Sequence, residues 1–323
     1  MDRRGFITGL AVGALLASRS ADAQPARRMR RIGWLSPAAT GDGLPSLRAG
    51  LGELGYVEGQ NIAIEARRAD GRSERLPQLA AELVRLPVDV LCTEGTQAAA
   101  AAKQATSTIP IVFANVAFPE RSGLVASYAR PGGNITGVAF IGPEYGKRLE
   151  LLKEARPRLS RVALIYNPDN PASVLALEET QRWASALGIG LEPHELRGPR
   201  DLERVVGAIA AKRPDALMTT ADPLIASYRE RIVAVAAKQR LPSMYPSREF
   251  VDAGGLMFYG GSISEMYRRA AVYVDKILKG AKPGDLAIEQ PTKFDMVINL
   301  KAAKALGITI PQSILVRADK VIE

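Results

Sequence analysis

Short apolar runs alternate along this chain with longer segments in which apolar residues recur every three or four positions. The run at 31–36, for example, ends at Pro37 and precedes leucines at helical spacing between Leu44 and Leu54. A short apolar run bounded by turn residues is typical of a buried strand, and the second spacing is typical of an amphipathic helix. The first part of the chain therefore predicts strands at 31–36, 61–65, 88–91 and 109–113, and helices at 44–54, 76–86, 96–103 and 123–129.

A second series of the same kind follows the turn residues Gly132, Gly133 and Asn134. It predicts strands at 161–166, 190–192, 216–218, 242–244 and 256–258, with helices at 173–187, 201–212 and 223–239. Strands that alternate with helices at this spacing favour a parallel sheet with helices on both faces. Two series of similar size therefore predict an α/β protein with two doubly wound, parallel-sheet lobes.

A third piece, with a helix at 265–278 and a strand at 294–298, comes after the second series is complete. In a two-lobed protein this piece adds further crossings between the lobes. No long Gly/Ser linker separates the two series, so we expect short hinge segments that allow bending around a cleft.

The first residues read as an export signal. Arg3 and Arg4 precede the apolar run 9–17, which is followed by the small-residue pattern Ala21-Asp22-Ala23. The run is shorter than the roughly 20 residues that span a bilayer, and paired arginines are typical of the bacterial twin-arginine route. We therefore expect a signal peptide that is cleaved near Ala23, and a periplasmic protein. Because no later run reaches transmembrane length, we expect no membrane-spanning segment after the cleavage position.

Composition excludes several classes of site. Cys92 is the only cysteine, so neither an internal disulfide nor a cysteine cluster for zinc or iron–sulfur ligation is available. The formal net charge is +9. Most basic residues nevertheless alternate with acids, as Arg148 does with Glu150, and lack interleaved aromatics. This pattern predicts a solvated basic surface and no nucleic-acid partner.

Ligands of open parallel sheets bind beyond the carboxyl ends of the strands, so residues just after each apolar run are the candidates for a site. These residues are mostly polar or aromatic and uncharged, which indicates recognition more than reaction. The candidate ligand-binding residues are Ser36, Thr93, Gly95, Thr96, Asn115, Phe118, Tyr166, Asn167, Asn170, Asp222, Tyr245 and Tyr259.

Two of these candidates allow two interpretations. Thr96 opens an alanine-rich helix, where its hydroxyl could cap the helix while backbone amides bind a ligand carboxylate, or the residue could be an ordinary N-cap with no ligand nearby. Asp222 precedes Pro223, a common helix start, and could either cap that helix or pair with a ligand ammonium group. The sequence leaves both alternatives open.

No constellation of catalytic residues is found in the sequence. His194 is the sole histidine and stands between Pro193 and Glu195, as expected for a strand-edge residue. Without a second histidine or a cysteine partner, the usual nucleophile pairs cannot be assembled. The sequence has no Gly-x-Gly-x-x-Gly after a strand and no Gly-x-x-x-x-Gly-Lys, the glycine motifs that bind the phosphates of dinucleotides and nucleoside triphosphates. We therefore expect no catalytic residue, no metal and no cofactor.

Several segments also carry a family resemblance. "GLVASYARPGGNITGV", "RLELLKEARPRLSRVALIYNP", "YRRAAVYVDKILKGAKPGDLAIEQPTKFDMVINLKAAKALG" and the ending "VRADKVIE" resemble the ABC-transporter substrate-binding family that includes the tryptophan-type binding proteins. The resemblance covers nearly all of the chain after residue 23. It implies the periplasmic-binding-protein type I fold, a hinge with three crossings, a ligand enclosed between the lobes, and delivery to an inner-membrane permease.

With that family in mind, we expect lobe 1 to comprise 29–140 plus 260–290, and lobe 2 to comprise 141–259 plus 291–323. The ligand class is a small organic molecule: an amino acid, an aromatic acid or another small carboxylate. The expected state is a monomer. Ser36 and Thr96 would hold the ligand carboxylate, and Tyr166, Asn167, Asp222 and Tyr245 would be added on closure.

The sequence departs from the family at one place. Many relatives have an acidic residue and a proline after the strand that ends "PIVF", whereas Phe118 and Pro119 stand here. This change predicts a pocket that lost an acid and gained an aromatic wall, which favours a ligand that is aromatic or lacks an amino group. Two other functions remain open: a ligand-presenting partner of a membrane receptor, and an exported enzyme on the same fold.

Overall fold

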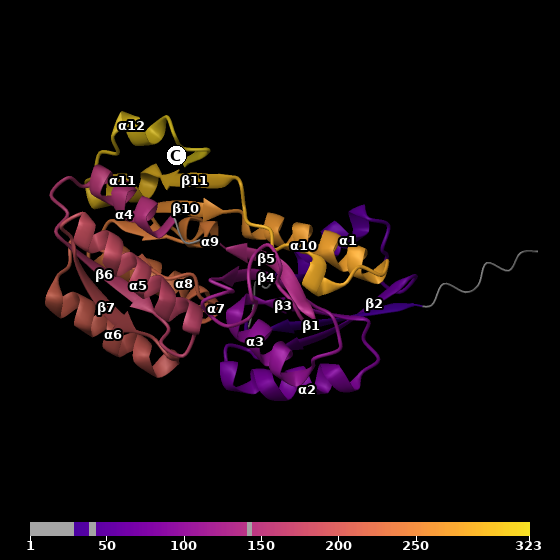
Figure 1. The fold of residues 1–323 in the computed structure, drawn as a ribbon. Coiled ribbons are helices and arrows are strands. Elements are labelled where there is room, and N and C mark those ends of the chain that lie inside the picture. The colour runs from indigo at the N-terminus through magenta and orange to yellow at the C-terminus, as the bar shows by residue number, and fades with distance from the viewer. Residues whose placement is uncertain (1–28, 39–42, 141–143) are drawn as a thin grey trace, which may run out of the picture.

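The computed structural model describes residues 29–38, 43–140 and 144–323. The predicted signal peptide and its cleavage position near Ala23 lie outside the described residues. Two α/β lobes lie side by side and are connected by several passages of the chain (Figure 1).

The first lobe is built on a five-stranded sheet with the order β2-β1-β3-β4-β5, in which every pair of neighbours is parallel. Its strands are β1 (Arg30–Ser36), β2 (Ile62–Arg68), β3 (Val90–Glu94), β4 (Ile111–Ala117) and β5 (Ile135–Phe140). Its helices are α1 (Leu44–Glu53), α2 (Leu76–Arg85), which follows the short 3₁₀ turn η1 (Ser73–Arg75), and α3 (Gly95–Ala105).

Helices cover both faces of this sheet because the side chains of each strand alternate between the faces. On β1, Ile32 and Trp34 pack with α1, whereas Leu35 packs with α2 and α3. A fourth helix, α10 (Ile263–Leu278), comes from late in the sequence and lies beside α1 on the first face (Figure 1). Tyr267 and Val274 of α10 are buried in that core.

The second lobe is built on a seven-stranded sheet with the order β12-β11-β10-β9-β8-β6-β7. Only the pair β10–β11 is antiparallel. The strands are β6 (Arg161–Tyr166), β7 (Gly190–Glu195), β8 (Ala216–Thr219), β9 (Ser243–Tyr245), β10 (Met257–Gly261), β11 (Phe294–Asn299) and β12 (Lys320–Ile322).

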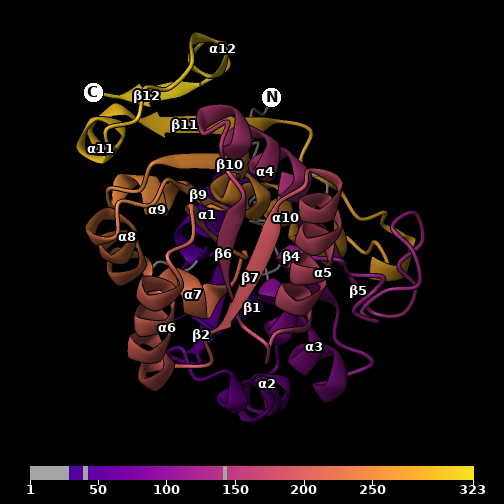
Figure 2. The same cartoon turned by 90° about the vertical axis from the view of Figure 1, so that its left-hand side faces the viewer.

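Two groups of helices cover the two faces of the second sheet (Figure 2). One face is covered by α4 (Glu144–Ala155), α5 (Pro171–Ala186), α11 (Leu300–Leu306) and α12 (Gln312–Leu315). The other is covered by α6 (Pro199–Lys212), α7 (Pro223–Ser227), α8 (Arg229–Lys238) and α9 (Arg248–Asp252).

The chain passes between the lobes three times. It leaves β5 for α4, leaves β10 for α10, and returns from the 3₁₀ turn η2 (Pro283–Asp285) to β11. The predicted fold, two doubly wound lobes joined by a hinge with three crossings, is confirmed. No helix in the described ranges is both long and apolar enough to cross a membrane.

Some of the predicted elements are wrong. Residues 123–129 form an irregular loop in place of a helix, and Gly123 adopts a positive φ of 72° there. Strand β5, entirely buried, was missed directly after this loop. The predicted helix 223–239 is two helices, because Tyr228 between them has φ −102° and ψ 11°.

Candidate ligand-binding cleft

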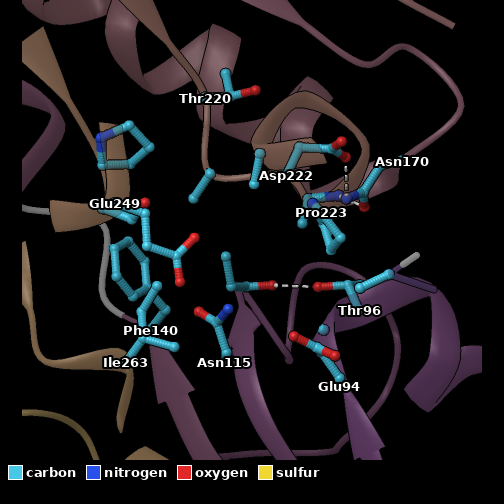
Figure 3. Close-up of a pocket in the computed structure, with 18 of the residues that line it drawn as sticks. Glu94, Thr96, Asn115, Phe140, Asn170, Thr220, Asp222, Pro223, Glu249 and Ile263 are labelled. Carbon is cyan, nitrogen blue, oxygen red and sulfur yellow. Dashed lines mark hydrogen bonds between the residues drawn. The ribbon is translucent and has the colours of Figure 1, made fainter. Parts of the chain in front are cut away.

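A cavity lies between the two lobes, where the carboxyl ends of β3, β4 and β5 face the starts of α5, α7 and α9 (Figure 3). The space that protein atoms leave empty is about 880 Å³, including its opening to solvent. The first lobe and the passage to α10 contribute Ala38, Glu94, Gly95, Thr96, Asn115, Ala117, Phe140 and Ile263. The second lobe contributes Asn170, Ala172, Thr220, Ala221, Asp222, Pro223, Ala226, Arg229, Pro246, Ser247, Glu249 and Phe250.

Helix α3 begins at this cavity. Strand β3 runs as far as Glu94, so the helix starts at Gly95, whose φ is 73°, and Glu94 is the N-cap residue. The Thr96 hydroxyl lies inside the first turn and donates to the Ala117 carbonyl at 3.5 Å. The prediction that Thr96 caps the helix is therefore wrong. The Glu94 side chain forms no capping hydrogen bond to the first turn, where backbone amides lack intrahelical partners.

Glu94 is an acidic residue of the site that the sequence analysis missed. Its side chain lines the cavity, and its Oε2 accepts a hydrogen bond of 2.5 Å from the hydroxyl of Ser36. Ser36 is fully buried and also accepts from the Ala38 amide at 3.0 Å. Ser36 thus orients the Glu94 side chain but does not line the cavity itself. Both neighbours of Glu94, Thr93 and Gly95, are strand-end candidates in the sequence analysis, but Glu94 itself, the last residue of β3, is not.

Asp222 lies at the centre of a hydrogen-bond network on the second lobe. Its Oδ2 accepts from Asn170 Nδ2 at 2.8 Å and from Asn167 Nδ2 at 3.1 Å. Its Oδ1 accepts from the Ile225 amide at 3.0 Å and so caps α7. Burial raises the pKa of Asp222, and these hydrogen bonds lower it. Capping by Asp222 is confirmed, and ligand contact by this residue stays a prediction.

Three further polar candidates occupy different places. Asn115 lines the cavity from a bulge in β4, where the chain adopts a φ of 57°. Asn170 lines it too, and also caps α5 by accepting from the Ala172 amide at 3.1 Å. Thr93 is fully buried and does not line the cavity.

The four aromatic candidates do not line the cavity. Tyr245 is buried against Phe250, with ring centroids 4.6 Å apart. Tyr259 stacks on Phe294 at 5.8 Å, and the Tyr166 hydroxyl bonds to Glu195 at 3.2 Å. Strand side chains alternate in direction, so position at a strand end alone cannot say which of them face the cleft.

Phe118 also points elsewhere than expected. Its ring stacks on Tyr145, with centroids 6.0 Å apart, and forms no wall of the cavity. The apolar walls are instead Phe140, Phe250 and Ile263. The sequence predicts that Phe118 replaces a pocket acid and forms an aromatic wall, but position 118 does not line the cavity.

The charges that line the cavity are mainly negative. Glu94, Asp222 and Glu249 face it, and Arg229 is the only cation among the described residues that line it. Partial burial raises the pKa of Glu249, opposed by Arg229. A negative cavity in a chain of net charge +9 favours a ligand group of positive charge. Within the described residues, no group of three or more His, Cys, Asp or Glu side chains could hold a metal ion.

Comparisons with known proteins agree with this architecture. A sequence model of the ABC transporter substrate binding protein family matches residues 39–322. The chain is also similar to a conserved domain protein of Vibrio cholerae, at 30% identity and a TM-score of 0.86, over 91% of this chain and 100% of that one. The chain belongs to the ABC transporter substrate-binding family, and its fold is that of the type I periplasmic binding proteins.

Two relatives have a ligand in their names. A domain from Streptococcus pneumoniae, solved in complex with L-Trp, is 27% identical with a TM-score of 0.85, over 91% of this chain and 100% of that one. A tyrosine-binding protein of Clostridioides difficile is 26% identical over 259 residues, covering 80% of this chain and 74% of the relative. The chain is therefore a solute-binding component of an ABC transporter.

Proposed function

We propose that this protein captures an amino acid with an aromatic or large apolar side chain in the interlobe cleft. The observation that carries this proposal is the combination of Glu94 and Glu249 with the apolar walls Phe140 and Phe250 in one cavity. Carboxylates pair with an ammonium group, and aromatic walls bury an apolar side chain. The relatives named for tyrosine and L-Trp support the same ligand class.

The carboxylate of the ligand would meet the start of α3. The uncapped amides at Gly95 and Thr96 carry the positive end of the helix dipole, which favours a carboxylate. Asp222 and Asn115 complete the polar contacts from the two sides of the cleft. Ser36 and Asn167 would act indirectly, since each holds a carboxylate that lines the cavity.

Binding involves closure of the lobes without any covalent step. The cavity takes its walls from both lobes, so the complete set of contacts exists only in the closed form. The ligand then shifts the open–closed equilibrium by its differential affinity, and a permease can recognise the closed form as occupied. We propose lobe boundaries at 29–140 plus 260–290 and at 141–259 plus 291–323.

The proposal includes export. Residues 1–23 would direct the chain through the twin-arginine route and be removed, which leaves a monomer in the periplasm that delivers its ligand to an inner-membrane permease. Edman sequencing of the periplasmic protein tests the cleavage position. A new N-terminus far from Gln24 would contradict it.

A ligand screen by thermal shift tests the ligand class. L-tryptophan, L-tyrosine and L-phenylalanine are compared with 3-phenylpropanoate, which lacks the amine, and phenethylamine, which lacks the carboxylate. A ligand at 100 times its Kd stabilises the folded state by about 2.7 kcal/mol. We expect stabilisation by the amino acids alone. Stabilisation by 3-phenylpropanoate alone would contradict the role of the cavity carboxylates.

A substitution tests whether Glu249 contacts the ammonium group of the ligand. Glu249→Gln removes one negative charge from the cavity, and we expect it to weaken amino-acid binding by about tenfold or more, measured by calorimetry. Glu203→Gln is the matched control, because the Glu203 side chain is 73% exposed and lies outside the cavity. Equal affinities of the two variants would remove Glu249 from the site.

A further inference from the structure

Ion pairs at the rim of the cleft join the two lobes outside the cavity. Arg121 belongs to loop 118–134 of the first lobe, between β4 and β5. Its Nη1 lies 2.6 Å from Glu179 Oε1, and its Nη2 lies 2.7 Å from Glu178 Oε2. Both glutamates belong to α5 of the second lobe. We call Arg121, Glu178 and Glu179 the rim clamp.

The loop that carries Arg121 is anchored to the first lobe. The Lys103 ammonium group on α3 donates to the carbonyls of Gly123 and Leu124, at 2.7 and 3.0 Å. The Arg121 guanidinium also lies over the Phe118 ring, 5.4 Å from its centroid. These contacts hold the arginine in place before it meets α5, so less conformational entropy is lost when the ion pairs form.

Two weaker contacts accompany the rim clamp. The Phe118 ring stacks on Tyr145 of α4, at an interplanar angle of 14°. The Gln97 side chain on α3 donates to the Asp169 carbonyl of the second lobe at 3.0 Å. Both contacts join a residue of the first lobe to one of the second. Separation of the lobes must therefore break a set of contacts in which the ligand takes no part.

We propose that Arg121 sets the ligand affinity of this protein from outside the cavity, by stabilising the closed arrangement of the lobes. This inference rests on the proposed binding function, because closure matters for affinity only if a ligand is enclosed. The Arg121 side chain is 42% exposed, and those of Glu178 and Glu179 are 50% and 19% exposed. Solvent therefore screens the pair to Glu178 more strongly than the pair to Glu179. The clamp therefore biases the open–closed equilibrium and does not lock it.

The charge-reversing variant Arg121→Glu tests the clamp, because it replaces attraction across the rim by repulsion. We expect a larger radius of gyration of the ligand-free protein in small-angle X-ray scattering. We also expect L-tryptophan to dissociate about threefold to tenfold faster in stopped-flow measurements, since release requires opening. Adding Glu178→Arg restores one attractive pair, and both quantities should return towards those of the wild type.

Arg48→Glu is the matched control. It makes the same change of charge and breaks an exposed ion pair to Glu58 of 2.8 Å that lies wholly within the first lobe. Circular dichroism checks that each variant is folded. The proposal is overturned if Arg121→Glu matches Arg48→Glu in radius of gyration, or if the added Glu178→Arg changes nothing. Failure of L-tryptophan to bind the wild type contradicts the ligand class alone, because the scattering comparison needs no ligand.

Discussion

Glu144 and Arg148 form a fully buried ion pair at the start of α4, close to a passage between the lobes. Glu144 Oε1 lies 4.0 Å from Arg148 Nη2, and both side chains are inaccessible to solvent. Arg148 Nε donates to the Tyr259 carbonyl at 2.7 Å, whereas neither Glu144 carboxylate oxygen has a hydrogen-bond partner among the residues that the structure describes. Burial raises the pKa of Glu144 to about 7, and the nearby charge of Arg148 lowers it.

This raised pKa predicts a pH dependence of stability. Between its ordinary value of 4.5 and about 7, the folded protein holds the Glu144 proton more tightly than the unfolded chain does. The contribution of Glu144 to stability is therefore fully present below pH 4.5 and is lost as the pH rises through about 7. In Glu144→Gln this dependence is absent. We expect the wild type to lose about 3 kcal/mol relative to the variant over this range.

Urea denaturation at a series of pH values measures the difference. Glu150→Gln, on the same helix with 41% of its side chain exposed, is the control and should run parallel to the wild type. If the curves of Glu144→Gln and the wild type are parallel too, the pKa of Glu144 is the same in the folded and unfolded states, and the raised pKa is contradicted.

At the same scale, the sequence predicted which residues stand near strand ends but not where their side chains point. Gly95, Thr96, Asn115, Asn170 and Asp222 line the cavity as placed by this reasoning. Phe250 and Glu249 could not be found in this way, because they lie on the short helix α9 beyond a three-residue strand.

At the scale of elements, the close approach of β5 to β4 depends on one glycine. Gly137 has a φ of 153°, and a Cβ atom at this position would stand 2.0 Å from the Phe113 carbonyl oxygen of β4. Gly137→Ala therefore forces the edge strand β5 away from β4. We expect a loss of about 3 kcal/mol or more, or an insoluble protein.

Gly52→Ala is the control for this substitution. Gly52 lies in α1, and nothing stands within 4 Å of its added Cβ. We expect a gain of about 0.5–1 kcal/mol, because alanine is the better helix former. Thermal unfolding of both variants measures the contrast, and a Gly137→Ala protein as stable as the wild type would show that β5 can shift without cost.

The same glycine explains a failure of sequence reasoning. Apolar periodicity identified strands such as β1 and β6, whose buried runs are bounded by turn residues. In β5, Thr136 and Gly137 interrupt the apolar run, although every residue of the strand is buried. Their burial depends on the neighbouring β4 and on the Leu286 carbonyl, to which Thr136 donates at 2.7 Å. Such long-range contacts leave no local pattern in the sequence.

At the scale of the whole molecule, the first lobe is discontinuous in sequence. Helix α10 follows the second lobe's β10 but packs against α1, β4 and β5 of the first lobe. It buries apolar side chains that include Met266, Tyr267, Tyr273 and Val274. At about 1.5–3 kcal/mol for each buried apolar side chain, their contribution is comparable to the whole stability of a domain.

Fragments of the chain test this dependence. A fragment of residues 29–140 lacks α10 and exposes the face of the sheet on which α1 and α10 pack. We expect it to be unfolded or aggregated, as judged by circular dichroism and light scattering. Joining residues 260–290 to it through a flexible linker restores that face, and we expect cooperative unfolding. A stable, cooperative 29–140 fragment would mean that α10 is a connector between the lobes and no part of the first lobe's core.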